Sequence, residues 1–186
     1  MCSGNGTNFQ NIVTNPVCNT NEVVLMIHNT KHCGAVKRAA KFGIPHVRLA
    51  HKEEEQMIKL FETWRVDLIV LAGYMRVIQN PSAFPAPIIN IHPSLLPKYK
   101  GLHAIEQALD SGDDVTGVSV HYVNEELDGG EIILQQEVPI LPNDNIDSLT
   151  KAIQRIEYGI LPAAIEHVKH QFEQQTHLYL LSYDIH

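Results

Sequence analysis

Asn90 and His92 carry the side chains best suited to chemistry in this sequence, because an amide donates hydrogen bonds and an imidazole titrates near neutral pH. They belong to the apolar run 88–92, IINIH, which predicts a buried strand that Pro93 terminates. Side chains two positions apart face the same side of a strand, so the pair projects together. In an open α/β sheet, ligands bind beyond the carboxyl ends of the strands. The pair is therefore a candidate site.

A purely structural role for this pair stays open at this point. A histidine after a strand is more often a hydrogen-bonded structural residue, and asparagine is common at turns. The functional interpretation is favoured by the rigid and basic loop directly after the strand, with Pro93, Pro97, Lys98, Lys100 and Gly101.

The segment 3–8, SGNGTN, predicts a glycine-rich turn that enters a short helix capped by Thr7 or Asn8. Glycines let the backbone approach an anion, and the first N–H groups of a helix point toward it. The turn is therefore a candidate phosphate cradle, although on these residues alone a turn without any ligand is the more common case. Its members are Ser3, Gly4, Asn5, Gly6, Thr7 and Asn8.

The elements that must position these residues have an alternating pattern. Apolar runs at 22–29, 46–50 and 66–74 predict strands, and the segments 34–43 and 53–65 predict helices. This alternation indicates a parallel sheet of βαβ units. Met57, Leu60, Phe61 and Trp64 recur at helical spacing, so we expect this stripe in the core.

The second half of the chain predicts an antiparallel edge. A helix at 102–113 precedes two β runs, 115–123 and 131–140, which a turn with Asp128 joins. Asp-Gly-Gly is by itself more often a hairpin signal than a catalytic one. A helix is expected from about 145 to 175.

Two further features are expected in this C-terminal region. Pro162 should kink or break the helix. The segment 178–183, LYLLSY, predicts an additional edge strand.

Four motifs together resemble one known family. They are SGNGTN at 3–8, AGYMR at 72–76, HPSLLPKYKG at 92–101 and ELDGGEIILQ at 126–135. In this order and spacing the sequence is similar to the glycinamide ribonucleotide formyltransferases, folate-dependent enzymes of purine synthesis. HPSLLP alone also resembles other folate-formyl domains, and SGNGTN with its spacing to the DGG loop favours the glycinamide enzymes.

The resemblance implies an α/β fold in a single formyltransferase domain over residues 1–186. We expect a Rossmann-like, open and mostly parallel sheet with helices on both faces and an antiparallel edge. Members of the family begin with an apolar strand that delivers the 3–8 loop, and here only Met1 and Cys2 precede it. The expected sheet therefore lacks the family's first strand, which leaves three explanations open: a start assigned too late, a fragment, or a natural variant.

The resemblance also implies the reaction, the transfer of a formyl group from 10-formyltetrahydrofolate, a co-substrate, to the amine of glycinamide ribonucleotide. Asn90, His92 and Asp128 are the implied catalytic residues. The 3–8 loop would hold the substrate phosphate, and Glu157 would contact the ribonucleotide. Met75, Arg76 and Val77 would line the folate pocket with Asn90 and Asp128.

Composition limits the other possibilities. A chain of 186 residues with a formal charge of −7 fits one domain that binds small molecules rather than nucleic acid or an anionic membrane. Three cysteines without a CxxC motif favour the cytoplasm. The eleven histidines are scattered, so no metal is expected. A monomer and a homodimer are both compatible with the sequence.

Two other function classes stay open. One is a folate-dependent hydrolase that gives the formyl group to water, although such an enzyme would not need a phosphate cradle. The other is a non-catalytic folate- or nucleotide-binding domain, which the missing first strand makes credible.

Overall fold

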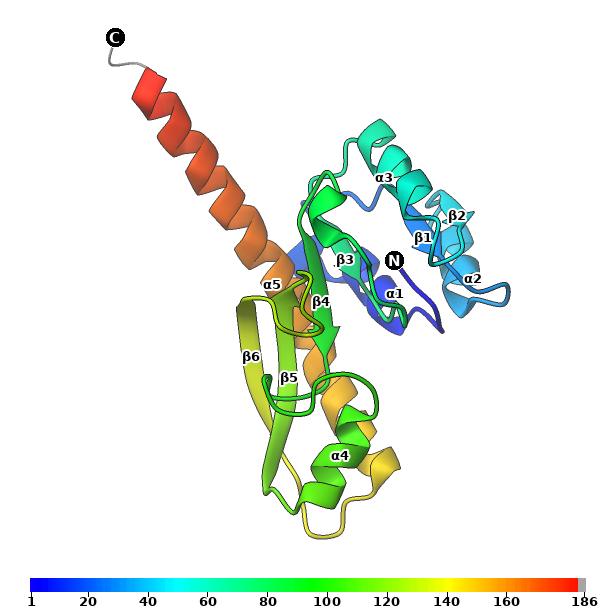
Figure 1. Cartoon of the computed structure of the whole chain (residues 1–186), viewed down its shortest axis with the longest axis vertical. Coiled ribbons are helices and arrows are strands. Elements are labelled where there is room, and N and C mark those ends of the chain that lie inside the picture. The colour runs from blue at the N-terminus through cyan, green and yellow to red at the C-terminus, as the bar shows by residue number, and fades with distance from the viewer. Residues whose placement is uncertain (184–186) are drawn as a thin grey trace.

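The computed structural model describes the backbone of residues 1–183 and the side chains of residues 1–175, and Figure 1 shows its elements. The strands are β1 (Met26–His28), β2 (His46–Arg48), β3 (Ile69–Leu71), β4 (Ile88–His92), β5 (Val115–Tyr122) and β6 (Ile132–Pro139). The helices are α1 (Thr7–Thr14), α2 (Gly34–Lys41), α3 (Glu54–Thr63), α4 (Ala104–Ser111) and α5 (Ile146–Tyr183), with short 3-10 turns at Pro16–Cys18 and Pro81–Ala83. This order confirms the predicted alternation of strands and helices.

The strands form two ladders. One pairs β1 with β2, and the other has the order β3-β4-β5-β6. The β1–β2 and β3–β4 pairs are parallel, whereas β4–β5 and β5–β6 are antiparallel. The predicted α/β fold with an antiparallel edge is confirmed.

Met1–Ser3 lie between β1 and β3 and connect the two ladders. Cys2 forms a parallel bridge with His28, and its N–H donates to the Ile27 carbonyl at 2.9 Å. On the other side, the Ala72 N–H donates to the Met1 carbonyl at 3.0 Å. These three residues therefore occupy only one end of the position that a central strand would fill, the end nearest the carboxyl ends of β1 and β3.

Two predicted strands are shorter in the structure. The runs 22–29 and 66–74 form ladders only over Met26–His28 and Ile69–Leu71. The residues that precede β1 and β3 flank the rest of this central position, where the described part of the chain supplies no neighbouring strand to complete the pairing. Apolar sequence alone does not make a strand without a partner for its backbone.

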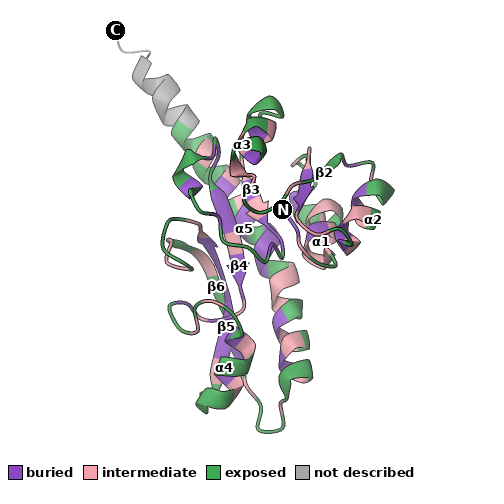
Figure 2. Cartoon of the chain, turned by 45° about the vertical axis from the view of Figure 1, so that its right-hand side comes forward, coloured by how far each residue is buried: buried purple, intermediate pink, exposed green. Residues whose placement is uncertain are grey.

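Helices cover both faces of the sheet, as predicted. Ile89 and Ile91 of β4 belong to the same apolar cluster as Leu161 of α5. Ile88 belongs instead to a cluster with Phe61 of α3. Because alternate residues of one strand face opposite sides, α5 and α3 lie on opposite faces, and Figure 2 shows β4 and β5 largely buried.

Three local predictions are wrong. Trp64 is 40% exposed rather than in the core, because α3 ends at Thr63 and Trp64 follows it at the surface. The α1 helix begins after Gly6, which has a left-handed backbone, so neither Thr7 nor Asn8 caps it. Pro162 does not break α5, whose neighbouring Leu161 and Ala164 are buried in the core.

The predicted edge strand at 178–183 is also wrong, because these residues continue α5. Leucine and tyrosine are compatible with both structures, and leucine is a good helix former. None of the helices within residues 1–183 has the length and apolar character of a membrane span.

Candidate active site

Three segments leave the sheet at the edge where β4 ends. Leu71, the last residue of β3, pairs with Asn90 in the parallel ladder, so the segment that follows β3 runs beside His92. The Ser3 N–H donates to the Gly73 carbonyl at 3.0 Å, which brings the 3–8 loop to the same edge. The carboxyl ends of parallel strands thus gather the predicted loops in one place.

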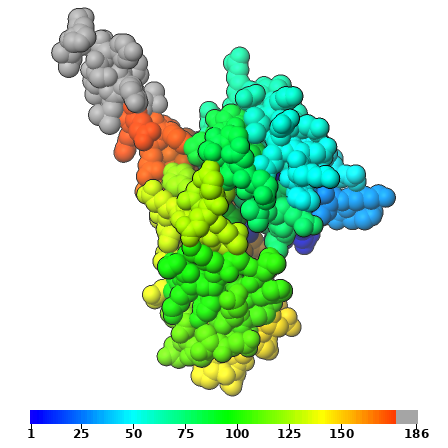
Figure 3. All heavy atoms as spheres, in the orientation of Figure 1, coloured from blue at the N-terminus to red at the C-terminus, as the bar shows by residue number. Residues whose placement is uncertain are grey.

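Asp128 joins this edge from the loop between β5 and β6. Its Oδ2 lies 3.5 Å from Nδ1 of His92, and both side chains are buried. The Gly101 N–H donates to the same oxygen at 2.8 Å, which fixes the carboxylate. Asp128 has φ 49°, and a Cβ at Gly130 would lie 1.8 Å from the Tyr122 carbonyl oxygen, so the loop needs this glycine. Figure 3 shows this loop, in yellow-green, beside the green segments around β4.

The hydrogen bonds of His92 fix its tautomer. Nε2 lies 2.7 Å from the Tyr99 carbonyl oxygen, which only accepts, so Nε2 carries a proton. Nδ1 then faces Asp128 with either a lone pair or a second proton.

His121 is a fourth member of the site that sequence reasoning missed. It lies opposite Asn90 in the antiparallel ladder and is 2% exposed. Nδ1 donates to the Tyr122 carbonyl at 2.8 Å, and Nε2 lies 3.4 Å from Nδ2 of the Asn90 amide. The same Nε2 lies 3.6 Å from Oδ1 of Asp128. The only sequence signal was a histidine within the predicted β run 115–123.

The surroundings of Asp128 keep it ionised. Burial opposes its charge, but contacts from His121 and the Gly101 N–H, together with the charge of His92, outweigh burial and hold the pKa of the carboxyl below its usual value. The site therefore presents a carboxylate between two imidazoles. One amide and two imidazoles around a fixed carboxylate can stabilise a developing charge and relocate a proton.

The 3–8 loop is held in shape by its neighbours. Arg38 Nε donates to the Asn5 carbonyl at 2.8 Å, and the Ala35 N–H donates to the Gly4 carbonyl at 3.3 Å. Gly6 has φ 77°, and a Cβ there would lie 2.6 Å from Cβ of Ala35. The loop therefore packs directly on the start of α2, and Gly6 is needed for both its conformation and its close approach.

Ser3 connects this loop to the segment after β3. Its hydroxyl donates to Asn29 Oδ1 at 2.6 Å and accepts from the Met75 N–H at 2.9 Å. Met75 and Val77 are exposed at 65% and 54%, so they offer an apolar surface to a ligand. The 3–8 loop and residues 75–77 are thus neighbours, and Arg76 between them is exposed.

Glu157 of α5 lies against the other end of the loop. Asn8 Nδ2 donates to Glu157 Oε2 at 3.3 Å. Burial raises the pKa of the Glu157 carboxyl, and the Asn8 hydrogen bond only partly opposes this. The Asn8 Oδ1 atom is buried and has no hydrogen-bond partner among the described residues. Glu157 therefore meets the loop rather than the group formed by Asp128 and the two histidines.

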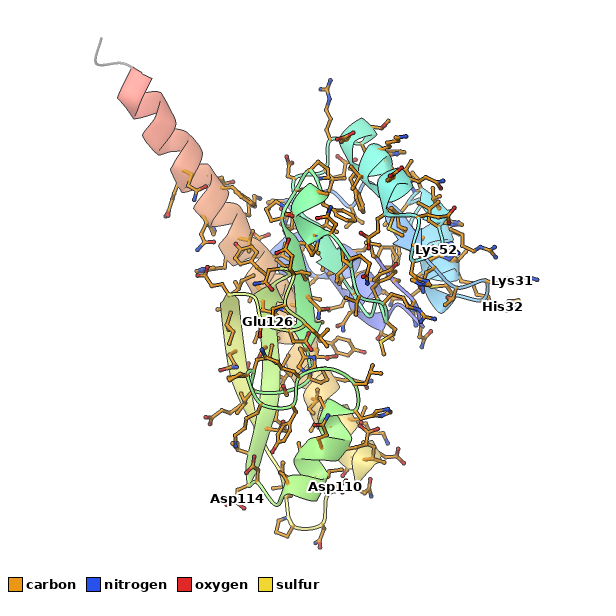
Figure 4. All side chains as sticks on the ribbon, in the orientation of Figure 1. Lys31, His32, Lys52, Asp110, Asp114 and Glu126 are labelled. Atoms are coloured by element: carbon orange, nitrogen blue, oxygen red, sulfur yellow. The ribbon has the colours of Figure 1, made fainter. Side chains whose placement is uncertain are left out.

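The histidines outside this site are spread over the chain. Within the part of the chain that the structure describes, no three His, Cys, Asp or Glu side chains are placed to hold a metal ion. His28 is buried and bonded to the Thr30 carbonyl, whereas His32 lies at an exposed loop tip beside Lys31 (Figure 4).

Comparisons with known proteins show the family of this chain. A sequence model described as "Formyl transferase" matches residues 1–165. The chain is 38% identical over 178 residues to phosphoribosylglycinamide formyltransferase of Escherichia coli (strain K12), covering 89% of this chain and 83% of that protein. A crystal structure of phosphoribosylglycinamide formyltransferase from Bacillus halodurans matches with a TM-score of 0.81 and 37% identity, covering 89% of this chain and 91% of that one.

A longer relative contains a similar region. The trifunctional purine biosynthetic protein adenosine-3 of Drosophila melanogaster is 39% identical over 178 residues, which cover 89% of this chain. The match covers only 13% of that protein's length.

Proposed function

Because the chain belongs to the formyl transferase family, we propose that it transfers the formyl group of 10-formyltetrahydrofolate to the amine of glycinamide ribonucleotide. The observation that carries this proposal is the group formed by Asn90, His92 and Asp128 at the sheet edge to which the 3–8 loop and residues 75–77 also come. A two-substrate transfer needs such an arrangement, with one ligand on each side of the reacting groups.

In this proposal the amine attacks the formyl carbon directly. The resulting tetrahedral centre carries an oxyanion and an ammonium, so the site must stabilise one charge and move a proton from the other. The Asn90 amide has two N–H donors; one faces His121, and the other is the donor that we assign to the oxyanion. No covalent bond to the protein is required.

His92 and Asp128 supply the charge and the proton path. With Nε2 bonded to Tyr99, the Nδ1 proton of an imidazolium is the one that can reach the oxyanion or the leaving nitrogen. Asp128 lies beside Nδ1 of His92 and is placed to orient a water that carries the amine proton away. The C–N bond to the folate then breaks as the leaving nitrogen gains a proton.

The two substrates lie on either side of these groups in the proposal. The 3–8 loop, with Ser3, Gly4, Asn5, Gly6, Thr7 and Asn8, binds the ribonucleotide phosphate in this proposal, and backbone N–H groups at the start of α1 act as donors. Glu157 contacts the same substrate and aligns it through Asn8. Met75, Arg76 and Val77 hold the folate ring with Asn90 and Asp128, since exposed apolar side chains suit a flat heterocycle.

The same proposal covers the domain organisation, the oligomeric state and the cellular location of the protein. Residues 1–186 act as one formyltransferase domain on two small-molecule substrates, as a monomer or homodimer, and without a metal. The cytoplasmic location rests on the three free cysteines.

The test is donor consumption by the purified chain, measured with and without glycinamide ribonucleotide. We expect consumption only when the ribonucleotide is present. Consumption without it would assign a hydrolase, and ligand binding without any turnover of either kind would assign a non-catalytic binding domain.

A further inference from the structure

Tyr99 holds His92 through its backbone, in the loop that follows β4. The Tyr99 carbonyl oxygen lies 2.7 Å from Nε2 of His92 and accepts its proton. Two residues later, the Gly101 N–H donates to Oδ2 of Asp128 at 2.8 Å. One short segment therefore contacts both His92 and Asp128, and its position determines how these two side chains face each other.

The backbone of Tyr99 has a conformation that tyrosine rarely adopts. Its φ is 55°, in the left-handed region that favours glycine. A non-glycine residue keeps such a conformation only where the surrounding structure holds it, and residues of this kind are concentrated at active sites. The position of the Tyr99 carbonyl therefore depends on contacts made by the rest of the residue and its loop.

The Tyr99 side chain is anchored to Asp113, in the turn between α4 and β5. Its hydroxyl donates to Asp113 Oδ2 at 2.5 Å, and Lys98 Nζ donates to the same oxygen at 2.7 Å. The hydrogen bond from Lys98, followed by the one from Tyr99, lowers the pKa of the Asp113 carboxyl, so this acceptor is ionised at neutral pH. The Asp113 N–H donates to the Ser111 hydroxyl at 3.0 Å, which fixes the residue in its turn.

The base of the same loop has a separate attachment. Ser119 of β5 pairs with His92 in the ladder, and its hydroxyl donates to the Ser94 carbonyl at 2.7 Å. The same hydroxyl accepts from the Leu96 N–H at 3.1 Å. Removing the Tyr99 hydroxyl therefore releases the tip of the loop and leaves its base on β5.

We propose that Tyr99 and Asp113 are positioning residues for the formyl transfer, an inference that rests on the proposed function. The contact between the hydroxyl and the carboxylate fixes the Tyr99 carbonyl, and that carbonyl keeps a proton on Nε2 of His92. Nδ1 is then the nitrogen that faces Asp128 and the reacting groups. Both residues act through His92 rather than on a substrate.

The test compares Tyr99→Phe with the wild-type chain by NMR of ¹⁵N-labelled histidine and by steady-state formyl transfer. At high pH, where imidazoles are neutral, the ¹⁵N shifts show which ring nitrogen carries the proton, and His92→Ala identifies the signals of His92. We expect the proton on Nε2 in the wild-type chain and a mixture of both tautomers in Tyr99→Phe. kcat should fall about 10- to 100-fold with both KM values unchanged, because a small displacement of a reacting group has an effect of this size.

Substitutions in the turn between α4 and β5 provide the controls. Asp113→Leu should behave like Tyr99→Phe, whereas Asp113→Asn keeps an oxygen that accepts from the Tyr99 hydroxyl and should retain most of the activity. Asp114→Leu, at the exposed next position (Figure 4), should leave the tautomer and kcat unchanged. Tyr99→Phe combined with Asp113→Leu should be no slower than either single variant, because both remove the same contact.

The tautomer of His92 separates this inference from the proposed function. An unchanged tautomer in Tyr99→Phe would overturn the inference, whatever happens to kcat or to stability. Should the wild-type chain transfer no formyl group, the proposed function fails, and a changed tautomer in Tyr99→Phe and Asp113→Leu would still support the anchor.

Discussion

His92 Nδ1 lies 3.5 Å from Oδ2 of Asp128, and the two side chains are 7% and 8% exposed. The strand β4 places the imidazole at its carboxyl end, and the loop after β5 brings the carboxylate back over it. Two segments that are far apart in the sequence thus form one charged, water-poor contact. The proposed chemistry depends on this contact.

Asp128→Asn keeps the shape of the side chain and removes its charge. We expect kcat to fall about 100-fold or more, since the imidazolium and the proton path both lose their partner. Steady-state formyl transfer measures this. Asp110→Asn is the matched control, because Asp110 is an exposed residue of α4 at the far end of the molecule (Figure 4). Equal rates for the wild-type chain and Asp128→Asn would remove Asp128 from the mechanism.

The same substitution has a pH signature in stability. The pKa of Asp128 is lower in the folded chain than in the unfolded chain, where it is about 3.9. The ionised carboxylate therefore stabilises the fold above about pH 4, and this stabilisation is lost as the pH falls through the folded pKa. Urea unfolding between pH 7 and pH 3 should show the wild-type advantage over Asp128→Asn shrinking at the acidic end. A constant difference would contradict the assignment.

His121 is a positioning residue in this mechanism, since it contacts Asn90 and Asp128. His121→Phe should lower kcat about 10- to 100-fold, the equivalent of losing a contact to a charged group. The pH profile of kcat should also shift, because Asp128 loses a contact that keeps it ionised. A variant that loses stability without any change in its pH profile would show that His121 only packs.

Gly6 and Gly4 of the 3–8 loop provide a test substitution and its matched control. Gly6→Ala meets Ala35 at 2.6 Å and forces a positive φ of 77°, so we expect a loss of about 1–3 kcal/mol in unfolding free energy and a higher KM for the ribonucleotide. Gly4→Ala meets nothing within 4 Å and should be nearly neutral for stability. Thermal and urea unfolding of both variants check this, and similar losses in both would count against the loop geometry.

Glu157→Gln should separate stability from substrate binding. Burial raises the pKa of Glu157, so stability falls as the pH rises from the unfolded pKa to the folded pKa and stays lower above it, and none is lost below the unfolded pKa. Glutamine should therefore stabilise the fold at pH 7 and make no difference at pH 3. KM for the ribonucleotide should rise while KM for the folate stays the same. A rise in both constants would place Glu157 outside the ribonucleotide site.

The local sequence pattern was sufficient to predict the strands whose neighbouring strands are present. The strand at 88–92 ends where Pro93 requires it, and Asn90 and His92 lie together because their spacing matches the strand period. The strands β1 and β3 were predicted too long; for example, the apolar residues 23–25 before β1 have no ladder partner within the described chain.

His121 could not be predicted for a different reason. Its importance arises from the register that sets it opposite Asn90, and a sequence does not determine the register of two strands that a helix separates. Trp64 was misplaced because helical spacing was extended one residue past the end of α3.

The most direct measurement of the central claim uses a ¹³C-labelled formyl group on the folate donor and follows it by NMR. With glycinamide ribonucleotide and the purified chain, the label should move from the folate nitrogen to the glycinamide amine, and His92→Ala should slow this by orders of magnitude. Label that appears as free formate, or moves at the wild-type rate in His92→Ala, would contradict the proposed transfer at Asn90, His92 and Asp128.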